Sequence, residues 1–292
     1  MSVWLLLLLN RLFPLPRHPF NTEVSGELSY TQWQFQMGHR TIEFFEDYTD
    51  PRDMFASRRV LDIGCGGGGK TCYYATLGAR EVCGVDPVSH YRLEAEEFAR
   101  KMGLDDRVYF ITADAAKLPH PDGKFDTVIM NDTFEHLDEP RAVLRECARV
   151  MAPGGRLFLN FPPYYHPYGA HLSDAIGIPW VHVLFSEKTM IEAYRRLVSP
   201  LPDAKRRLRL RLGDDPEAQS LSYINRMTAR RFRRILEEVP FEVLYHREYP
   251  LRSFLKPLTY IPIVREGFLR MVVAVLRPAT GMSETTDRPA LP

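Results

Sequence analysis

Residues 60–71 read Val-Leu-Asp-Ile-Gly-Cys-Gly-Gly-Gly-Gly-Lys-Thr, and this stretch decides the fold. The apolar run 60–63 is typical of a buried strand, and the glycines that follow predict a turn where the backbone approaches a ligand closely. A helical pattern comes next, so the free N–H groups of the turn and of the helix N-terminus face one crevice. The stretch therefore predicts a pocket for a nucleotide-containing cofactor.

The glycine loop by itself fits more than one cofactor. Gly64, Gly66 and Gly69 match the G-x-G-x-x-G dinucleotide fingerprint, and Asp86 lies where a ribose-binding acid belongs. Asp62 discriminates, because a pyrophosphate repels a carboxylate, whereas a cofactor with an amino group and a sulfonium accommodates it. The loop still leaves an NAD-type oxidoreductase open as an alternative, although Asp62 is unfavourable for it and the chain lacks a Tyr-x-x-x-Lys hydride-site pattern.

Residues 62–68 resemble the first motif of the class I S-adenosylmethionine-dependent methyltransferases, with Gly64, Gly66 and Gly68 as its glycines. Further motifs follow in the order of that family. They are Glu-Val-Cys-Gly-Val-Asp-Pro at 81–87, Ile-Thr-Ala-Asp-Ala at 111–115, Phe-Asp-Thr-Val-Ile-Met-Asn-Asp at 125–132, Phe-Glu-His-Leu at 134–137 and Arg-Val-Met-Ala-Pro-Gly-Gly at 149–155. The chain is similar in particular to the small-molecule subgroup called type 11.

The resemblance implies that S-adenosylmethionine is the cofactor and assigns its binding residues. The glycine loop with Asp62 is expected at the methionine end, the acid of the second motif at the ribose, and the third motif at the adenine. The expected cofactor-binding residues are Asp62, Gly64, Cys65, Gly66, Gly68, Asp86, Pro87, Asp114, Ala115 and Asn131.

The alternation of strand and helix patterns predicts an α/β fold, a Rossmann-like, doubly wound sheet of seven mostly parallel strands. The expected strands are 58–63, 81–85, 107–112, 125–130, 155–161, 241–245 and 271–276. The expected helices are 31–48, 69–77, 90–102 and 138–151. The glycine at 69 is expected only to start its helix.

The chain is expected to divide into a methyltransferase domain and flanking segments. Residues 1–50 form an apolar segment and a lid helix, 51–278 the domain, and 279–292 a disordered tail. An insertion over 162–222, between the fifth and sixth strands, begins with a stiff loop rich in proline, tyrosine and histidine. We expect it to act as the substrate-binding cap.

Methyl transfer is an in-line displacement in which the protein supplies alignment, and a hydroxyl acceptor also needs a base. His166 and His171 of the insertion loop are the first candidates, with His136 as a third. The alternative for each is a histidine that merely caps or packs. The set His166, His171, Asp174 and His182 could supply metal ligands, but its spacing matches no metal signature, so no metal is predicted.

The formal net charge of +1 excludes a global field that would attract nucleic acid. One basic strip, residues 205–211, alternates lysine and arginine with leucine, and as a strand it would be basic on one side. A solvated edge and an anion-binding site are both open. An anionic small-molecule acceptor is therefore compatible with the sequence.

Two apolar segments bear on location. The run Val3–Leu9 is too short to span a bilayer, which leaves a start-site artefact, a packed helix or a shallow membrane anchor. With residues 251–276 it could form an apolar mouth for a lipid-like acceptor, although core packing competes. Four cysteines without metal or redox spacing predict buried, reduced thiols in a cytoplasmic protein, with peripheral membrane contact as a further option.

These observations predict a methyltransferase that acts on a small molecule, with transfer to oxygen favoured. Two alternatives stay open beside it, the NAD-type oxidoreductase and a non-catalytic partner protein that only binds the cofactor. The sequence does not identify the acceptor or the oligomeric state.

Overall fold

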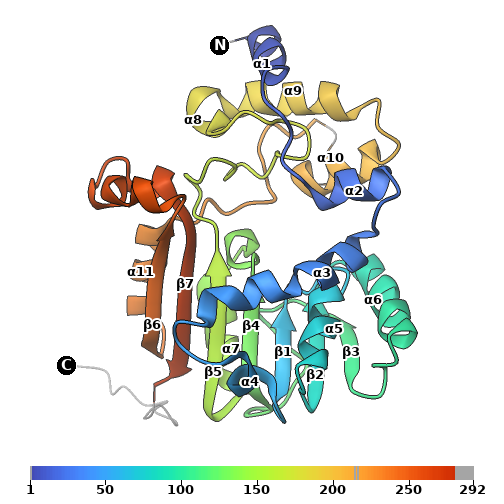
Figure 1. The fold of residues 1–292 in the computed structure, drawn as a ribbon, viewed down its shortest axis with the longest axis vertical. Helices are drawn as coiled ribbons and strands as arrows, with labels where there is room; N and C mark the ends of the chain where they lie inside the picture. Colours follow the sequence, from blue (N-terminus) through green and yellow to red (C-terminus); the bar gives the residue numbers. More distant parts are fainter. Residues whose placement is uncertain (1, 214, 216, 280–292) are drawn as a thin grey trace, which may run out of the picture.

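The computed structural model describes residues 2–213, 215 and 217–279, so the expected disordered tail lies almost wholly outside the described residues. A seven-stranded sheet in the order β3-β2-β1-β4-β5-β7-β6 forms its centre (Figure 1). The strands are β1 (Arg59–Ile63), β2 (Glu81–Asp86), β3 (Val108–Thr112), β4 (Phe125–Asn131), β5 (Met151–Phe161), β6 (Phe241–Pro250) and β7 (Leu269–Pro278).

The first five strands are parallel, and β7 runs antiparallel to both of its neighbours. The chain builds outward from β1 to β3 and then returns to place β4 on the other side of β1. This reversal opens a crevice beyond the carboxyl ends of β1 and β4, where ligands bind in such sheets. The predicted fold class and all seven strands are confirmed.

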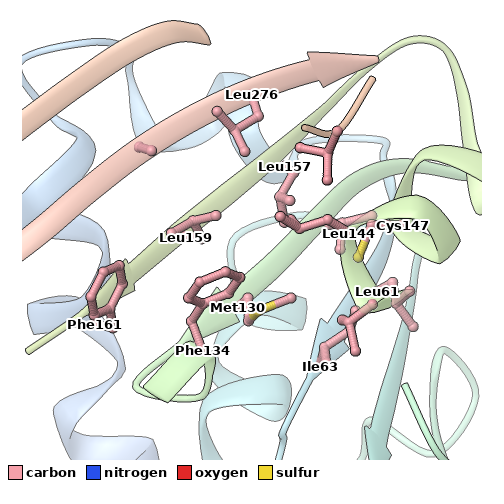
Figure 2. Packing of buried hydrophobic residues seen from close by; sticks show 14 of the residues in the cluster. Leu61, Ile63, Met130, Phe134, Leu144, Cys147, Leu157, Leu159, Phe161 and Leu276 are labelled. Carbon is pink, nitrogen blue, oxygen red and sulfur yellow. The ribbon is translucent and has the colours of Figure 1, made fainter. Parts of the chain in front are cut away.

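Helices cover both faces of the sheet because its central strands are apolar on both sides. One face carries α3 (Tyr30–Ile42), η1 (Glu43–Phe45), α4 (Pro51–Phe55), α5 (Gly69–Thr76) and α6 (Ser89–Lys101). The other carries α7 (Pro140–Val150), α11 (Ala229–Glu237) and the short turn η2 (Phe134–His136). Figure 2 shows the second core, in which Leu61 and Ile63 of β1 pack near Leu144 and Cys147 of α7.

The predicted helices and strands agree with the structure apart from their ends. The helix expected over 31–48 stops at Ile42 and continues as the 3-10 turn η1. The fifth strand begins at Met151, earlier than expected, because Met151 already pairs with Phe125 before an irregularity in the ladder. All four cysteines are free and buried, as predicted.

Beyond the carboxyl ends of the strands lies a cap with its own apolar core. The insertion contributes α8 (Val181–Leu184), α9 (Glu187–Val198) and α10 (Ala204–Leu212), and the N-terminal segment adds α1 (Val3–Asn10) and α2 (Pro19–Val24). The Asn10 amide donates to the Ala175 carbonyl over 3.0 Å, and its oxygen accepts from the Gly177 N–H over 2.8 Å. The N-terminal run is thus a helix packed on the cap.

The basic strip 205–211 is a helix, α10, so its charges do not lie on one side as they would in a strand. Helical spacing places Arg207 and Arg211 four residues apart on one face, where both meet the buried Asp174. The alternative of a solvated edge is wrong for these two residues, because they are buried. The ion pairs with Asp174 outweigh the alternation of charged residues with leucine in deciding where these side chains lie.

The segment between the last two strands forms two 3-10 helices, η3 (Ser253–Tyr260) and η4 (Arg265–Phe268), rather than part of the core. It lies beyond the end of the sheet where β6 stops and β7 starts (Figure 1). It does not join the N-terminal run in an apolar mouth, because α1 packs instead on α9. Among the described residues, no helix combines the length and apolarity needed to cross a bilayer.

Candidate functional site

A cavity of about 1410 Å³ opens at the carboxyl ends of the parallel strands, under the cap. Six of the ten expected cofactor residues line it, namely Gly64, Gly66, Asp86, Pro87, Asp114 and Ala115. Tyr30 of α3, Asp132 after β4, His136 of η2 and Tyr223, just after the insertion, also line it. The crevice that the motifs predicted therefore exists, and these motif residues face it.

The glycine loop takes a shape that side chains would obstruct. Gly64 has φ +75°, and a Cβ there would lie 2.3 Å from the Thr133 hydroxyl. Gly68 has φ +76° at the N-cap of α5, and its Cβ would lie 2.5 Å from that of Ala95. Both positions need a left-handed backbone and close contact, which only glycine supplies at low cost. The loop thus forms a cradle open to a ligand.

Asp86 ends β2 with its carboxylate beside this cradle. One oxygen accepts the Gly66 N–H and the other accepts the Val88 N–H, each over 2.9 Å. Burial raises the pKa of the carboxyl, and the two backbone donors oppose that rise. Each carboxylate oxygen keeps a further acceptor position, so the residue fits the two hydroxyls of a ribose.

Asp62 lies behind the loop and does not line the cavity. Its carboxylate accepts the Thr71 hydroxyl of α5 over 2.6 Å, and burial raises its pKa to about 7. Cys65, Gly68 and Asn131 likewise stand outside the cavity wall. These four residues lie behind the residues that line the cavity. Their direct contact with the cofactor stays a prediction.

Helix α3 lies across the outside of the glycine loop. The Gln34 side chain accepts from the Gly69 N–H over 3.3 Å and donates to the Cys65 carbonyl over 3.4 Å. A Cβ on Gly69 would stand 2.0 Å from the Thr31 carbonyl oxygen. Gly69 therefore starts α5, as expected, and also lets α3 approach, which the sequence did not reveal.

His136 brings an imidazole to the cavity wall. Its Nδ1 lies 2.6 Å from the Tyr223 carbonyl oxygen, which can only accept, so Nδ1 carries the proton and Nε2 the lone pair. Burial is the main cause that lowers the pKa of this imidazole, to about 4. His136 thus lines the cavity as a neutral imidazole, the form in which Nε2 can accept a proton, and its lowered pKa makes it a weak base.

Glu135 and His171 stand behind this imidazole. The ring centroids of His136 and His171 lie 4.8 Å apart, and Glu135 Oε1 lies 3.8 Å and 4.0 Å from their Nε2 atoms. Burial raises the pKa of Glu135 well above its usual range, which favours a neutral carboxylic acid. His171 does not line the cavity, and burial lowers its pKa well below the usual range.

His166 is hydrogen-bonded within its own loop. Its Nδ1 accepts the Tyr168 N–H over 3.2 Å within the loop, and it does not line the cavity. His166, a first candidate from the sequence, thus caps a turn. The third candidate, His136, lines the cavity. Glu135 was missed, although the Phe-Glu-His-Leu motif after the fourth strand carried the signal.

The four residues weighed as metal ligands do not come together. Among the described residues, only Glu135, His136 and His171 form a metal-compatible group, with ligand atoms within 4.8 Å of one another. That spread exceeds the roughly 3–4 Å between ligand atoms around a zinc ion bound at about 2 Å. Asp174 instead forms ion pairs in the core of the cap.

Helix α10 presents basic side chains on two faces. Lys205, Arg206 and Arg209 line the cavity, and Arg206 also pairs with Glu23 of α2 over 2.7 Å. On the other face, Arg207 donates to Asp174 over 3.0 Å. One face therefore holds the cap together, and the other gives the cavity a cationic wall that strand periodicity could not predict.

The comparisons with known proteins agree with this crevice. A family model described as a methyltransferase domain matches residues 61–159. The ubiquinone biosynthesis O-methyltransferase of Dechloromonas aromatica is 34% identical over 183 residues, which cover 60% of this chain and 75% of that protein. The 27-O-demethylrifamycin SV methyltransferase of Amycolatopsis mediterranei is 43% identical over 106 residues, 36% of this chain and 39% of that protein.

A solved structure shares the fold at low sequence identity. The geranyl diphosphate C-methyltransferase of Streptomyces coelicolor, solved with S-adenosyl-L-homocysteine, gives a TM-score of 0.53 at 16% identity over 90% of this chain and 84% of that chain. The chain spans less than half the length of the first curated relatives it matches. The comparisons give no support to an NAD-type oxidoreductase. The chain belongs to the class I S-adenosylmethionine-dependent methyltransferases.

Proposed function

We propose that the protein transfers a methyl group from S-adenosylmethionine to a hydroxyl group of a small molecule, with His136 as the general base. The observation that carries the proposal is the neutral imidazole on the cavity wall, held in one tautomer by Tyr223. The cradle at Gly64 and Gly66 and the carboxylate of Asp86 suit the cofactor. When bound, the cofactor supplies an electrophilic methyl group on a sulfonium.

The surroundings of His136 support proton transfer in both directions. Nε2 accepts the hydroxyl proton, and the imidazolium that results is stabilised by the Tyr223 carbonyl and the charge of Asp132. Burial opposes the charged form, so the proton is released again after transfer. The neutral Glu135 adds no charge that would hold the proton.

We propose that the cap selects the acceptor and that the acceptor carries a negative charge beside its hydroxyl group. The cationic wall of Lys205, Arg206 and Arg209 supports this charge, because guanidinium groups pair well with carboxylates and phosphates. One relative is described as a 27-O-demethylrifamycin SV methyltransferase, and another as an O-methyltransferase of ubiquinone biosynthesis. Both names support transfer to oxygen. A lipid-like body for the acceptor is part of the proposal.

We further propose a cytoplasmic location with peripheral membrane contact. The four free, buried cysteines support a reducing compartment. Exposed apolar side chains of the cap and of the η3–η4 segment support contact with a lipid surface.

Two measurements test the function. Calorimetric titration should show binding of S-adenosylhomocysteine and none of NAD, and the reverse result would overturn the cofactor. His136→Asn should lower labelled methyl transfer to the acceptors of a cell extract by about 10²–10⁴-fold while the affinity for S-adenosylhomocysteine stays unchanged. His166→Asn is the matched control and should keep both. Tight cofactor binding without transfer to any acceptor would favour the non-catalytic alternative.

A further inference from the structure

Large apolar side chains are exposed at one end of the molecule. Among the described residues, seven large apolar side chains are at least 60% exposed, and all but Leu93 lie in three segments. These segments are residues 2–18 with α1, helix α8, and residues 251–264 with η3, which together we call the apolar end. The six side chains are Trp4, Leu12, Val183, Phe254, Tyr260 and Ile263.

Helix α1 is the clearest part of the apolar end. Every residue from Val3 to Leu9 is apolar, yet only Leu6 is fully buried, against the core of the cap. A helix that is apolar all round normally buries its whole surface, and here the outward side, with Trp4 69% exposed, stays uncovered. Such a surface marks a contact with another apolar phase.

The three segments are linked indirectly, through α9 and η4. The Trp180 indole, at the N-cap of α8, donates to the Gly267 carbonyl over 3.1 Å, and its ring lies 6.0 Å from that of Phe268. On its other side α8 contacts α9, on which α1 packs. Figure 1 shows α1, α8 and the η3–η4 segment beyond the carboxyl ends of the parallel strands.

The charges of the apolar end have one sign. Residues 2–18 contain Arg11 and Arg17, residues 251–264 contain Arg252 and Lys256, and neither stretch contains an aspartate or glutamate. Two copies of the chain that met through this end would bring like charges together, and of the four cations only Arg17 has an acid partner in the ion pairs of the described residues, Glu27 at 3.7 Å. A bilayer with anionic head groups offers the apolar phase and the opposite charge at once.

We propose that the apolar end binds the surface of an anionic membrane, with Trp4, Leu12 and Ile263 inserted at the level of the head groups. Aromatic side chains such as Trp4 and Tyr260 prefer that interface. The attachment keeps the protein at the membrane, where a lipid-like acceptor resides. This inference deepens the proposed membrane contact and stands independently of the role of His136.

Cosedimentation of the full-length chain with vesicles tests the proposal. The protein should pellet with phosphatidylcholine vesicles that contain phosphatidylglycerol, and pellet less with phosphatidylcholine alone. Ile263→Glu and Trp4→Glu should each lower the partition coefficient about tenfold, since each replaces an inserted apolar side chain by a charge. The matched control is Leu93→Glu on α6, an equally exposed leucine elsewhere, which should bind like the parent.

Several results would overturn the proposal. These are no binding to either vesicle, equal loss in all three variants, or a dimer in analytical ultracentrifugation that Ile263→Glu dissociates, which would make a second copy the occupant. Titration with S-adenosylhomocysteine confirms that each variant is folded. Methyl transfer to a water-soluble acceptor should persist in Ile263→Glu, so failure of membrane binding is distinguishable from failure of the proposed function.

Discussion

The imidazole Nδ1 of His136 and the main-chain oxygen of Tyr223 lie 2.6 Å apart, across the boundary between the sheet and the cap. The contact joins a motif residue of the methyltransferase domain to Tyr223, which packs against the core of the cap. The backbone oxygen of Tyr223 sets the tautomer of His136, and the Tyr223 ring, 4.1 Å from the imidazole between centroids, packs against it. The cap therefore orients the candidate base as well as covering the cavity.

Asp86→Ala should remove cofactor binding. The substitution deletes the acceptors for the two ribose hydroxyls and for the N–H groups of Gly66 and Val88. Since hydrogen bonds to a charged group are worth about 1.5–3 kcal/mol each, the affinity for S-adenosylhomocysteine should fall at least about 100-fold. Calorimetry measures the loss, and Asp114→Ala, at an exposed acid of the same cavity, should cost less. Unchanged affinity in Asp86→Ala would contradict the assignment.

Asp62→Asn should weaken cofactor binding and yet stabilise the protein without cofactor. Burial raises the pKa of Asp62 to about 7, so the charged form costs stability as the pH rises through that value. Asparagine keeps an acceptor for the Thr71 hydroxyl and carries no charge. The rise in Tm should be larger at alkaline pH than at acidic pH, as differential scanning calorimetry would show. A rise independent of pH would refute the electrostatic explanation.

Stability should fall as the pH drops below the ordinary histidine value. Burial lowers the pKa of His18 from 6.5 to about 3 and that of His166 from 6.5 to about 4. The unfolded chain takes up these protons at a higher pH than the folded protein does. The neutral imidazoles therefore contribute their full share of the unfolding free energy above pH 6.5, and this share is lost as the pH falls to about 4. For His166 this amounts to roughly 3 kcal/mol.

Urea unfolding at a series of pH values measures this loss. His166→Asn keeps an acceptor for the Tyr168 N–H, removes the titration, and should therefore flatten the dependence of the unfolding free energy on pH. Identical pH slopes in parent and His166→Asn would exclude the mechanism.

Arg207→Met and Arg206→Met should separate the two faces of α10. Arg207 is buried and paired with Asp174, so its replacement leaves a buried carboxylate short of a partner and should cost about 3–5 kcal/mol of unfolding free energy. Arg206 is half-buried on the cavity side, so its replacement should change stability little and weaken binding of an anionic acceptor. Equal destabilisation by both changes would mean that α10 has no functional face.

Much of the fold was predictable because its signals are local in the chain. Apolar runs that end at Asp62, Asp86 and Asn131 mark strands, and the glycines after 63 mark a turn whose geometry leaves few alternatives. The Asp86 carboxylate beside the Gly66 N–H follows from the motif order, since neighbouring parallel strands end at the same edge. These positions depend on spacing along a strand, which the sequence displays.

The histidine assignments show where such signals stop. His166 and His171 were favoured because their loop starts where the fifth strand delivers residues to the crevice, yet His136 is the histidine on the cavity wall. A loop with two prolines and a glycine has no period, so the direction of its side chains depends on contacts with the rest of the cap. Three-dimensional packing alone placed His171 behind His136.

The sequence by itself determined the parallel sheet, the glycine cradle and the family, because strand periodicity and turn geometry are properties of short stretches of chain. The tertiary structure decided the rest. It made residues 3–10 part of the cap, turned the basic strip into a helix, and buried Arg207 and Arg211 against Asp174. These outcomes depend on partners more than a hundred residues away or on ion pairs within the insertion, and no local pattern encodes the free energy of such long-range contacts.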